Sequence, residues 1–455
     1  MRTRIWASLL LMALAALMIA AMPKSLNAAP NNFNSFGQVN LVSDLPGVAR
    51  FMDTDLVNPW GIAFSSGSPI WVSDNGTGLA TLYDGAGMKQ GLVVMIPAPG
   101  GGQGAPTGQV FNGGSGFNSD RFLFATEDGT IAGWRGALGT TAELGADNSG
   151  AGSVYKGLAL ATNGANSFLY ATDFHNGSVD VYNSTFTKVT LTGSFTDPTL
   201  PAGFAPFGIQ AFAGKLYVTY AMQDAAKHDD VACPGCGFVD VFNTDGTFVQ
   251  RLISMGALNS PWGLAWAPGN FGKFSNDLLV GNFGDGTINA FDPITGVQLG
   301  TLDGSNGMPL VNQGLWGLAF GNGAHGTNTS TLYFTAGIPG PDQIEDHGVF
   351  GAIATPEPSS LTLLSGGLVS LLGYGWRRAR RSSRAVSQKA PPDGKRPGPP
   401  CQKSDRYFSS NAYPPLRFAP SIRGVSPTAT LWDCCVSLHL RHLSSRVYET
   451  TFRCS

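Results

Sequence analysis

The chain alternates between short runs of apolar or alternating residues and short polar segments rich in Gly, Asn and Asp. Runs bounded in this way are typical of β-strands. Six such runs each lead into a turn, often with Asn-Gly or Asp-Gly, and then into a further strand-like run, as in β-hairpins. They lie at 69–74, 121–128, 167–173, 215–220, 277–282 and 331–336. The pattern predicts an all-β protein built from many short strands.

An internal repeat orders these runs. A Trp-Gly pair followed by apolar residues occurs at Gly61, Gly263 and Gly317, and weaker copies occur at Gly108, Gly157 and Gly208. The spacings between successive glycines are 47, 49, 51, 55 and 54 residues. Six copies of about 50 residues indicate a closed radial array or a solenoid. Since a fourth, more polar run follows in most copies, we predict a six-bladed β-propeller of four-stranded blades. A series of two-sheet sandwiches is the alternative.

The sixth copy lacks room for a fourth strand, because its third strand is followed directly by Pro356. The run 37–43 near the N-terminus is predicted to supply the missing strand and close the ring. The repeated glycine would start the innermost strand, where neighbouring blades crowd and a side chain would clash.

An aromatic residue precedes the repeated glycine in four copies: Trp60, Phe207, Trp262 and Trp316. These positions fall where one blade passes to the next, near one mouth of the central channel. One interpretation is a packing wedge between blades. The other is a ring of aromatic faces that stacks on a ligand such as a sugar.

Residues 33–354 resemble the NHL-repeat and gluconolactonase-like six-bladed propellers, and still more a group of secreted propellers with a C-terminal sorting tail. Gluconolactonase-like propellers hold a divalent cation at the channel mouth with Glu, Asn and Asp, and use carboxylates as acid and base. No residue-by-residue match to their motif is present here, so the resemblance predicts the fold rather than the catalytic residues.

Both ends of the chain carry predicted targeting segments. Residues 1–29 combine two arginines, an apolar run over 5–22 and small residues at Ala28 and Ala29, as in a secretory signal peptide. An uncleaved anchor is the alternative. Either reading predicts that the body is exported.

The C-terminal segment 355–381 is identified as a PEP-CTERM sorting signal, the substrate of exosortase-type proteases. It has a Pro-Glu-Pro triplet, an apolar stretch over 361–376 that is predicted to form a membrane helix, and an Arg cluster that stays on the cytoplasmic side. An ordinary C-terminal anchor is the alternative. The residues of the signal are Pro356, Glu357, Pro358, Arg377, Arg378, Arg380 and Arg381.

The remaining residues 382–455 depart from the family pattern and are predicted to be a disordered or aberrant tail. Their excess of basic residues also masks the negative charge of the rest of the chain. Residues 1–376 hold 13 of the 28 basic and 26 of the 30 acidic residues, so their net charge is about −13. An acidic body argues against nucleic acid as a partner.

Ionisable residues concentrate in the predicted loops around one mouth. His and carboxylates that converge from separate loops can hold a metal, and carboxylates with Asn suit Ca²⁺ or Mg²⁺. The alternative is that these residues only form turns. The candidate binding residues, besides the four aromatics, are Asp74, Asp128, Asp173, His175, His228, Asp229, Asn282, Asp346 and His347. The candidate metal ligands are Asp173, His175, His228, Asp229, Asp230 and His347.

Cys233 and Cys236 form a Cys-Pro-Gly-Cys motif, and they are the only cysteines before the basic tail. A local disulfide is the simplest interpretation for an exported protein. A zinc site would need two further ligands, which His228 and Asp229 or Asp230 could supply. A redox motif is the third reading.

These observations predict an exported, inner-membrane-tethered precursor that becomes a binding or scaffold protein of the cell surface or extracellular matrix. The resemblance implies an exosortase-type protease and the bacterial membrane as partners, and exopolysaccharide as a further one. A Ca²⁺- or Mg²⁺-dependent hydrolase or lactonase at the channel mouth is the alternative function.

Overall fold

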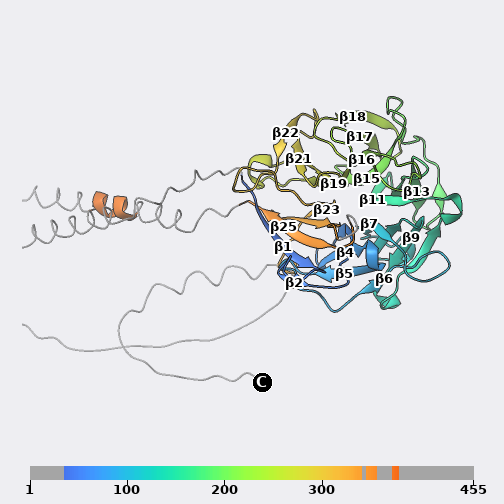
Figure 1. Cartoon of the computed structure of the whole chain (residues 1–455), viewed down its shortest axis with the longest axis horizontal. Coiled ribbons are helices and arrows are strands. Elements are labelled where there is room, and N and C mark those ends of the chain that lie inside the picture. The colour runs from blue at the N-terminus through green and yellow to red at the C-terminus, as the bar shows by residue number, and fades with distance from the viewer. Residues whose placement is uncertain (1–34, 341–344, 356–370, 379–455) are drawn as a thin grey trace, which may run out of the picture. The chain divides into compact units, whose positions relative to one another are not determined.

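The structure, a computed structural model, describes residues 35–340, 345–355 and 371–378. The chain divides into two units, residues 1–375 and 376–455, and all the sheets belong to the first. Six mainly antiparallel sheets surround a central axis, with the strands β7, β11, β15, β19 and β23 near the centre of the propeller in Figure 1. The predicted all-β six-bladed propeller is confirmed.

The first three blades take four consecutive strands each. Blade 1 contains β3 (Pro59–Ala63), β4 (Ile70–Asp74), β5 (Leu79–Tyr83) and β6 (Val94–Met95). Blade 2 contains β7 (Pro106–Phe111), β8 (Phe122–Thr126), β9 (Thr130–Trp134) and β10 (Glu143–Asp147). Blade 3 contains β11 (Tyr155–Asn163), β12 (Asn166–Asp173), β13 (Ser178–Asn183) and β14 (Lys188–Val189).

Blades 4 and 5 also take four consecutive strands each. Blade 4 contains β15 (Phe204–Phe212), β16 (Lys215–Met222), β17 (Phe238–Asn243) and β18 (Phe248–Ser254). Blade 5 contains β19 (Pro261–Trp266), β20 (Leu278–Asn282), β21 (Ile288–Phe291) and β22 (Gln298–Thr301). Short 3₁₀ turns are η1 (Asn75–Thr77), η2 (Phe117–Ser119), η3 (Gly136–Leu138), η4 (Ser149–Ala151) and η5 (Gly272–Phe274).

Blade 6 is completed by the N-terminal strand. It contains β23 (Leu315–Phe320), β24 (Leu332–Ala336), β25 (Val349–Ala354) and β1 (Gly37–Ser43), and β2 (Phe51–Met52) adds a fifth, parallel strand. β1 pairs antiparallel with β25 from Gly37 opposite Ala354 to Ser43 opposite Val349. The closing strand therefore has the predicted bounds, and the two ends of the propeller meet in one sheet.

The repeated glycine is required by close contact between innermost strands. A Cβ atom at Gly61 would lie 2.5 Å from the carbonyl oxygen of Thr107, and one at Gly317 would lie 2.5 Å from that of Trp60. Because any side chain would overlap these oxygens, only glycine lets the inner strands approach so closely. The contact between Gly317 and Trp60 joins blade 6 to blade 1.

Several sequence predictions fall outside the described residues. These are the signal peptide 1–29, the triplet Pro356-Glu357-Pro358, Arg380, Arg381, the tail 382–455 and most of the apolar stretch 361–376. Residues 371–378 form a helix, with Arg377 and Arg378 exposed near its end. Among the residues that the structure describes, no helix is long and apolar enough to span a bilayer.

Candidate functional site

Two sets of equivalent residues surround one mouth of the channel. The first set precedes the repeated glycine on each inner strand: Trp60, Thr107, Lys156, Phe207, Trp262 and Trp316. The second set is equivalent by the strand register and lies at or just after the end of the second strand of each blade: Asn75, Glu127, Phe174, Ala221, Phe283 and Gly337. Together the two sets divide the mouth into an aromatic half and a polar half.

The aromatic half is a packed cluster. The Trp60 and Trp316 rings stack with centroids 3.4 Å apart, and the Phe283 ring also stacks on Trp316, at 4.1 Å. Trp262 meets both tryptophans edge-on at 5.9 and 5.6 Å. Trp60, Phe207 and Trp316 are at most 2% exposed, and Trp262 is 8% exposed. The four predicted aromatics therefore gather, but their faces contact one another rather than solvent.

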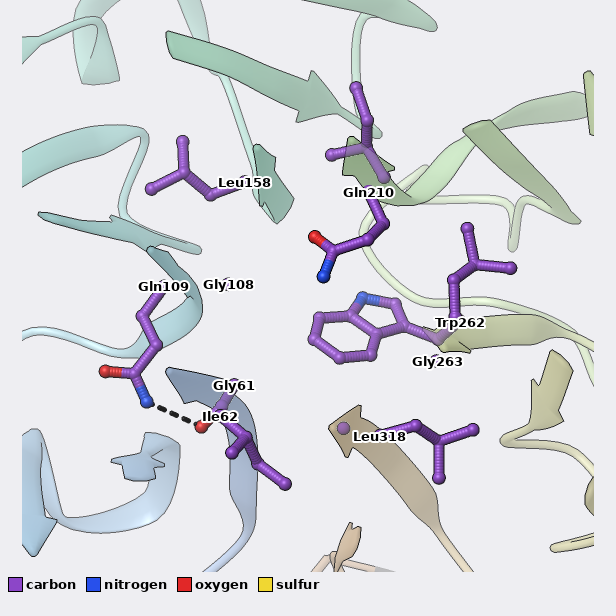
Figure 2. Close-up of a pocket in the computed structure, with 12 residues that line it drawn as sticks. Gly61, Ile62, Gly108, Gln109, Leu158, Gln210, Trp262, Gly263 and Leu318 are labelled. Carbon is purple, nitrogen blue, oxygen red and sulfur yellow. Dashed lines mark hydrogen bonds between the residues drawn. The ribbon is translucent and has the colours of Figure 1, made fainter. Parts of the chain in front are cut away.

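A small cavity lies behind this cluster on the channel axis. Its volume is about 40 Å³, and its lining includes Gln109, Gln210, Trp262 and Leu318 (Figure 2). The Gln109 amide donates to the backbone oxygens of Gly61 and Trp71 at 2.7 and 2.8 Å. A cavity of this size holds only a few water molecules. The cavity is therefore too small for a sugar-sized ligand.

Lys156 is the centre of the polar half. Its side chain is 2% exposed, and its ammonium group donates to Glu127 Oε1 and, at 3.1 Å, to Asp229 Oδ1. The ammonium nitrogen also lies 5.1 Å from the centroid of the Trp60 ring, within the range of cation–π attraction. Burial lowers the pKa of Lys156, but the charges of Glu127 and Asp229 outweigh it and raise the pKa overall. Lys156 is therefore a fixed positive charge.

A chain of amide hydrogen bonds links the aromatic cluster to the carboxylates. The Trp316 indole N–H donates to Asn58 Oδ1 at 3.1 Å, and Asn58 Nδ2 donates to Glu345 Oε1 at 3.0 Å. Asn75 Nδ2 donates to Glu127 Oε2 at 2.8 Å. Burial and then the charge of Glu127 raise the pKa of Glu345 to about 7. Glu345 can therefore gain or lose a proton near neutral pH.

Two long loops bring ionisable residues to the mouth. Residues 223–237 join β16 to β17 and residues 337–348 join β24 to β25, where other blades have short turns. In the first loop, His228 Nδ1 lies 2.9 Å from Asp229 Oδ1. Burial raises the pKa of Asp229, but Lys156 and His228 lower it overall. Burial raises the pKa of Asp230 to about 6, and its Oδ2 is buried with no hydrogen-bond partner among the described residues.

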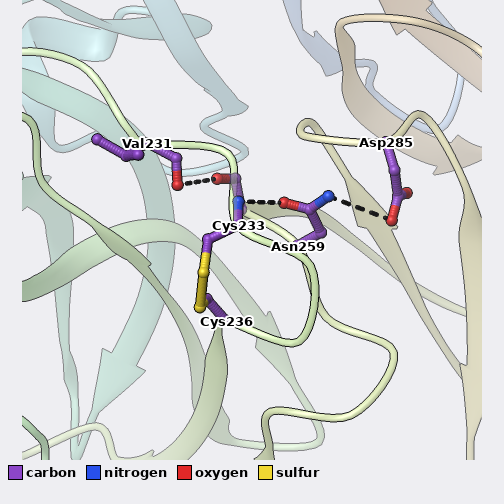
Figure 3. Close-up of a disulfide and its surroundings, with 6 residues drawn as sticks. Val231, Cys233, Cys236, Asn259 and Asp285 are labelled. Atoms are coloured by element: carbon purple, nitrogen blue, oxygen red, sulfur yellow. Dashed lines mark hydrogen bonds between the residues drawn. A yellow bond between two sulfur atoms is a disulfide. The ribbon is translucent and has the colours of Figure 1, made fainter.

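A disulfide between Cys233 and Cys236 lies at the end of this loop. The Cys233 N–H donates to Asn259 Oδ1 at 2.8 Å, and Asn259 Nδ2 contacts Asp285 Oδ2 at 3.4 Å (Figure 3). The loop is thus joined to blade 5 close to the position of Asp229. The two cysteines take no part in the group of possible metal ligands.

Among the described residues, one group of side chains has the spacing of a metal site: ligand atoms of Glu127, His228 and Asp229 lie within 4.8 Å of one another. Of the predicted metal ligands, it includes only His228 and Asp229. His347 Nδ1 instead lies 2.5 Å from Oδ2 of Asp44, the residue that directly follows β1. Asp173 accepts hydrogen bonds from Val154 N and Asn176, which hold its own turn. Asp173, His175, Asp230 and His347, the other candidate ligands, lie outside this group.

The remaining predicted residues bond mainly within or beside their own blades. Asp74 is buried and accepts from Thr81 Oγ1 at 2.8 Å, and Asp128 accepts from Ala105 N at 2.7 Å. Asn282 donates to Ala257 O at 2.7 Å. His175 and Asp346 are partly buried. These contacts stabilise turns and the connecting segments between blades.

Lys156 and Asn58 were not predicted from the sequence. A signal for Lys156 was present, because alignment on the repeated glycine places a lysine where four other copies have an aromatic residue. Asn58 has a positive φ of 46°, which no sequence pattern predicted.

No family model matches the chain. The solved structures of a streptogramin B lyase (15% identity, TM-score 0.42, 70% of this chain and 97% of that one) and of the soluble aldose sugar dehydrogenase of Escherichia coli (12% identity, TM-score 0.46, 71% and 100%) are similar in fold alone.

Two curated relatives come from Acanthamoeba polyphaga mimivirus. "Uncharacterized protein L690" is 34% identical over 329 residues, which are 69% of this chain and 84% of that protein. "Uncharacterized protein R648" is 32% identical over 314 residues, 66% and 76% of the two chains. The chain therefore belongs to the same protein family as these two mimivirus proteins.

Proposed function

We propose that the protein is an exported propeller that binds a small hydrogen-bond-donating ligand, an amine or a polyol, at the polar half of its mouth. The observation that carries this proposal is the charge balance around Lys156. Four carboxyl groups, those of Glu127, Asp229, Asp230 and Glu345, face one buried ammonium group and a partly exposed histidine.

The excess of acceptors defines the ligand chemistry. The raised pKa values of Glu345 and Asp230 reflect burial and, for each, a neighbouring negative charge. A ligand that brings an ammonium group or several hydroxyls would satisfy these acceptors, whereas an anionic ligand would add repulsion. The aromatic rings are buried by packing against one another, so in this proposal they stabilise the mouth and do not stack on the ligand.

A metal-dependent hydrolase is the second candidate function. It is favoured by the separation of pKa values within the mouth, raised for Glu345 and lowered for Asp229, because such pairs can act as acid and base. The donor set of Glu127, His228 and Asp229 suits a divalent ion. However, the Lys156 ammonium already bonds two of these three residues, so an ion would have to compete with it. The binding role is therefore preferred.

The setting of this activity is also part of the proposal. Residues 1–29 would direct export and residues 355–381 would tether the precursor to the membrane for an exosortase-type protease. In that setting the ligand of the mouth would be presented at the cell surface or in the extracellular matrix, and a neutral or amine-bearing exopolysaccharide fits the acceptor-rich site.

Calorimetric titration of the purified chain tests the ligand chemistry. We expect glucosamine or glucose to bind and glucuronate of the same size not to bind. Asp229→Asn should weaken binding about tenfold, the effect of one charged hydrogen bond. Asp245→Asn is the matched control, because the Asp245 carboxylate accepts from the N–H and hydroxyl of Thr247 in its own turn between β17 and β18. Preferential binding of glucuronate, or equal effects of the two variants, would contradict the proposal.

A further inference from the structure

A groove runs along the rim of the closing blade. Its two walls are residues 38–40 with 47–50, from and after β1, and residues 306–311, from the loop that follows β22. The volume of the groove is about 590 Å³. β1 and β2 mark its position at the edge of the propeller in Figure 1.

The chemistry of this groove differs from that of the rest of the body. Val39, Val48 and Val311 are 46%, 36% and 56% exposed, and the neighbouring Met308 is 62% exposed. Arg50 is the single charged residue in the lining, which contains no Asp or Glu. In a body with a net charge of about −13, a rim that combines exposed aliphatic side chains with one arginine is distinct. Gln38, Asn40 and Asn306 also line the groove, so it is amphipathic, as a contact with the interfacial region of a membrane requires.

The chain itself leaves the propeller beside this groove. Ala354 pairs with Gly37, the residue that precedes the groove wall on β1. Only residues 356–360 separate Thr355 from the apolar stretch 361–376, a span of about 20 Å at full extension. On the other side, the apolar run 5–22 ends 13 residues before Ser35. Both apolar segments are therefore attached at this rim.

The direction of β25 sets the position of the exit relative to the mouth. β25 begins at Val349, after the loop that carries Glu345 to the mouth, and ends at Ala354. Thr355 therefore lies at the end of blade 6 that is farther from the mouth.

We propose that this groove is a membrane-contact surface: the rim of blade 6 rests on the lipid bilayer, and the mouth opens away from it. Val39, Val48 and Val311 would enter the interfacial region, while Arg50 would pair with lipid phosphate. The inference rests on the proposed export and tethering, but it does not depend on which ligand the mouth binds.

Site-specific photocrosslinking of the full chain in vesicles tests this surface. A photoreactive phenylalanine analogue replaces Val48 or Val311 in the chain inserted into phosphatidylethanolamine and phosphatidylglycerol vesicles. The control position is Thr162, which is exposed at the corresponding end of blade 3, on the opposite side of the ring, and lines a comparable hollow. We expect lipid adducts at positions 48 and 311 to exceed those at 162 by about fivefold or more, as for side chains at the interface.

The outcomes distinguish the proposed membrane-contact surface from the proposed tethering of the chain to the membrane. Equal lipid adducts at all three positions, in a chain that stays with the vesicles after carbonate washing, would overturn the membrane-contact surface and leave tethering intact. Adducts between two copies of the chain at positions 48 and 311 would assign the groove to self-association instead. Loss of the chain from the washed vesicles would overturn tethering, and the contact surface with it.

Discussion

The ammonium nitrogen of Lys156 lies 5.1 Å from the centre of the Trp60 ring, at the boundary between the aromatic and polar halves of the mouth. The same ammonium group bonds Glu127 from blade 2 and Asp229 from blade 4. A single buried side chain thus links three other residues from three different blades. Any account of the mouth must explain why a lysine stands at a position that is aromatic in four of the six repeats.

Replacing Lys156 by Met should destabilise the propeller strongly. The carboxylates of Glu127 and Asp229 would lose their counter-charge, and breaking a buried ion pair costs about 3–5 kcal/mol. Urea unfolding of Lys156→Met measures this loss in the free energy of unfolding. Lys273→Met is the matched control, because Lys273 also lies over an aromatic ring, that of Phe274, but both it and its partner Asp303 are partly exposed, so its loss should cost about 1 kcal/mol or less. Similar losses in the two variants would contradict the role of Lys156.

The pKa of Glu345 predicts a specific dependence of stability on pH. Because the folded state raises this pKa from 4.5 to about 7, Glu345 contributes stability below pH 4.5, and that contribution is lost as the pH rises to 7. Glu345→Gln removes the titration. The stability of the variant relative to the wild type should therefore increase across this window, by at most about 1.4 kcal/mol per pH unit. Parallel stability curves of the two proteins would show that Glu345 does not titrate in this way.

Gly317→Ala should destabilise the closure between blades 6 and 1. The new Cβ would lie 2.5 Å from the carbonyl oxygen of Trp60, so the inner strands must separate at a cost of about 1–3 kcal/mol or more. Gly67→Ala is the control, since no atom lies within 4 Å of a Cβ built there. Thermal unfolding of both variants distinguishes them, and an equal midpoint would argue against crowding as the reason for the repeated glycine.

Reduction of the disulfide should loosen the loop that carries Asp229. Cys233 and Cys236 fix the end of the loop beside Asn259, so their reduction should raise amide hydrogen exchange at Asp229 and Val231. Thr126, at the end of β8 in blade 2, serves as the internal reference. Mass-spectrometric exchange before and after treatment with a phosphine reductant measures both. Unchanged exchange in residues 223–236 would show that the rest of the loop holds Asp229 without the disulfide.

The fold could be predicted from local patterns, whereas the mouth could not. The alternation over 37–43 and the turn residues after each second strand depend on neighbours in the sequence, and they led to six blades and to the closing strand β1. His347 was predicted as a candidate ligand at the mouth, and its contact with Asp44 arises because β1 and β25 lie side by side. That contact joins residues 303 apart in the sequence, which no local pattern specifies.

The long loops limited the prediction in a second way. Asp229 and Glu345 come from loops without strand periodicity, so their side-chain directions depend on partners such as Lys156 and Asn58. Alignment of the six glycines did place Lys156 among the aromatics, and its charge at a buried position was the available sign of a polar site.

Metal binding by the wild type and by Lys156→Met tests the central claim, that an internal lysine rather than a metal ion neutralises the carboxylates of the mouth. Elemental analysis and titration with Ca²⁺, Mg²⁺ and Zn²⁺ provide the measurement. The account predicts no stoichiometric ion in the folded wild type and an affinity at least about tenfold higher in the variant, a change of about 1.4 kcal/mol. One tightly bound ion per wild-type chain, weakened by removal of Lys156, would contradict it.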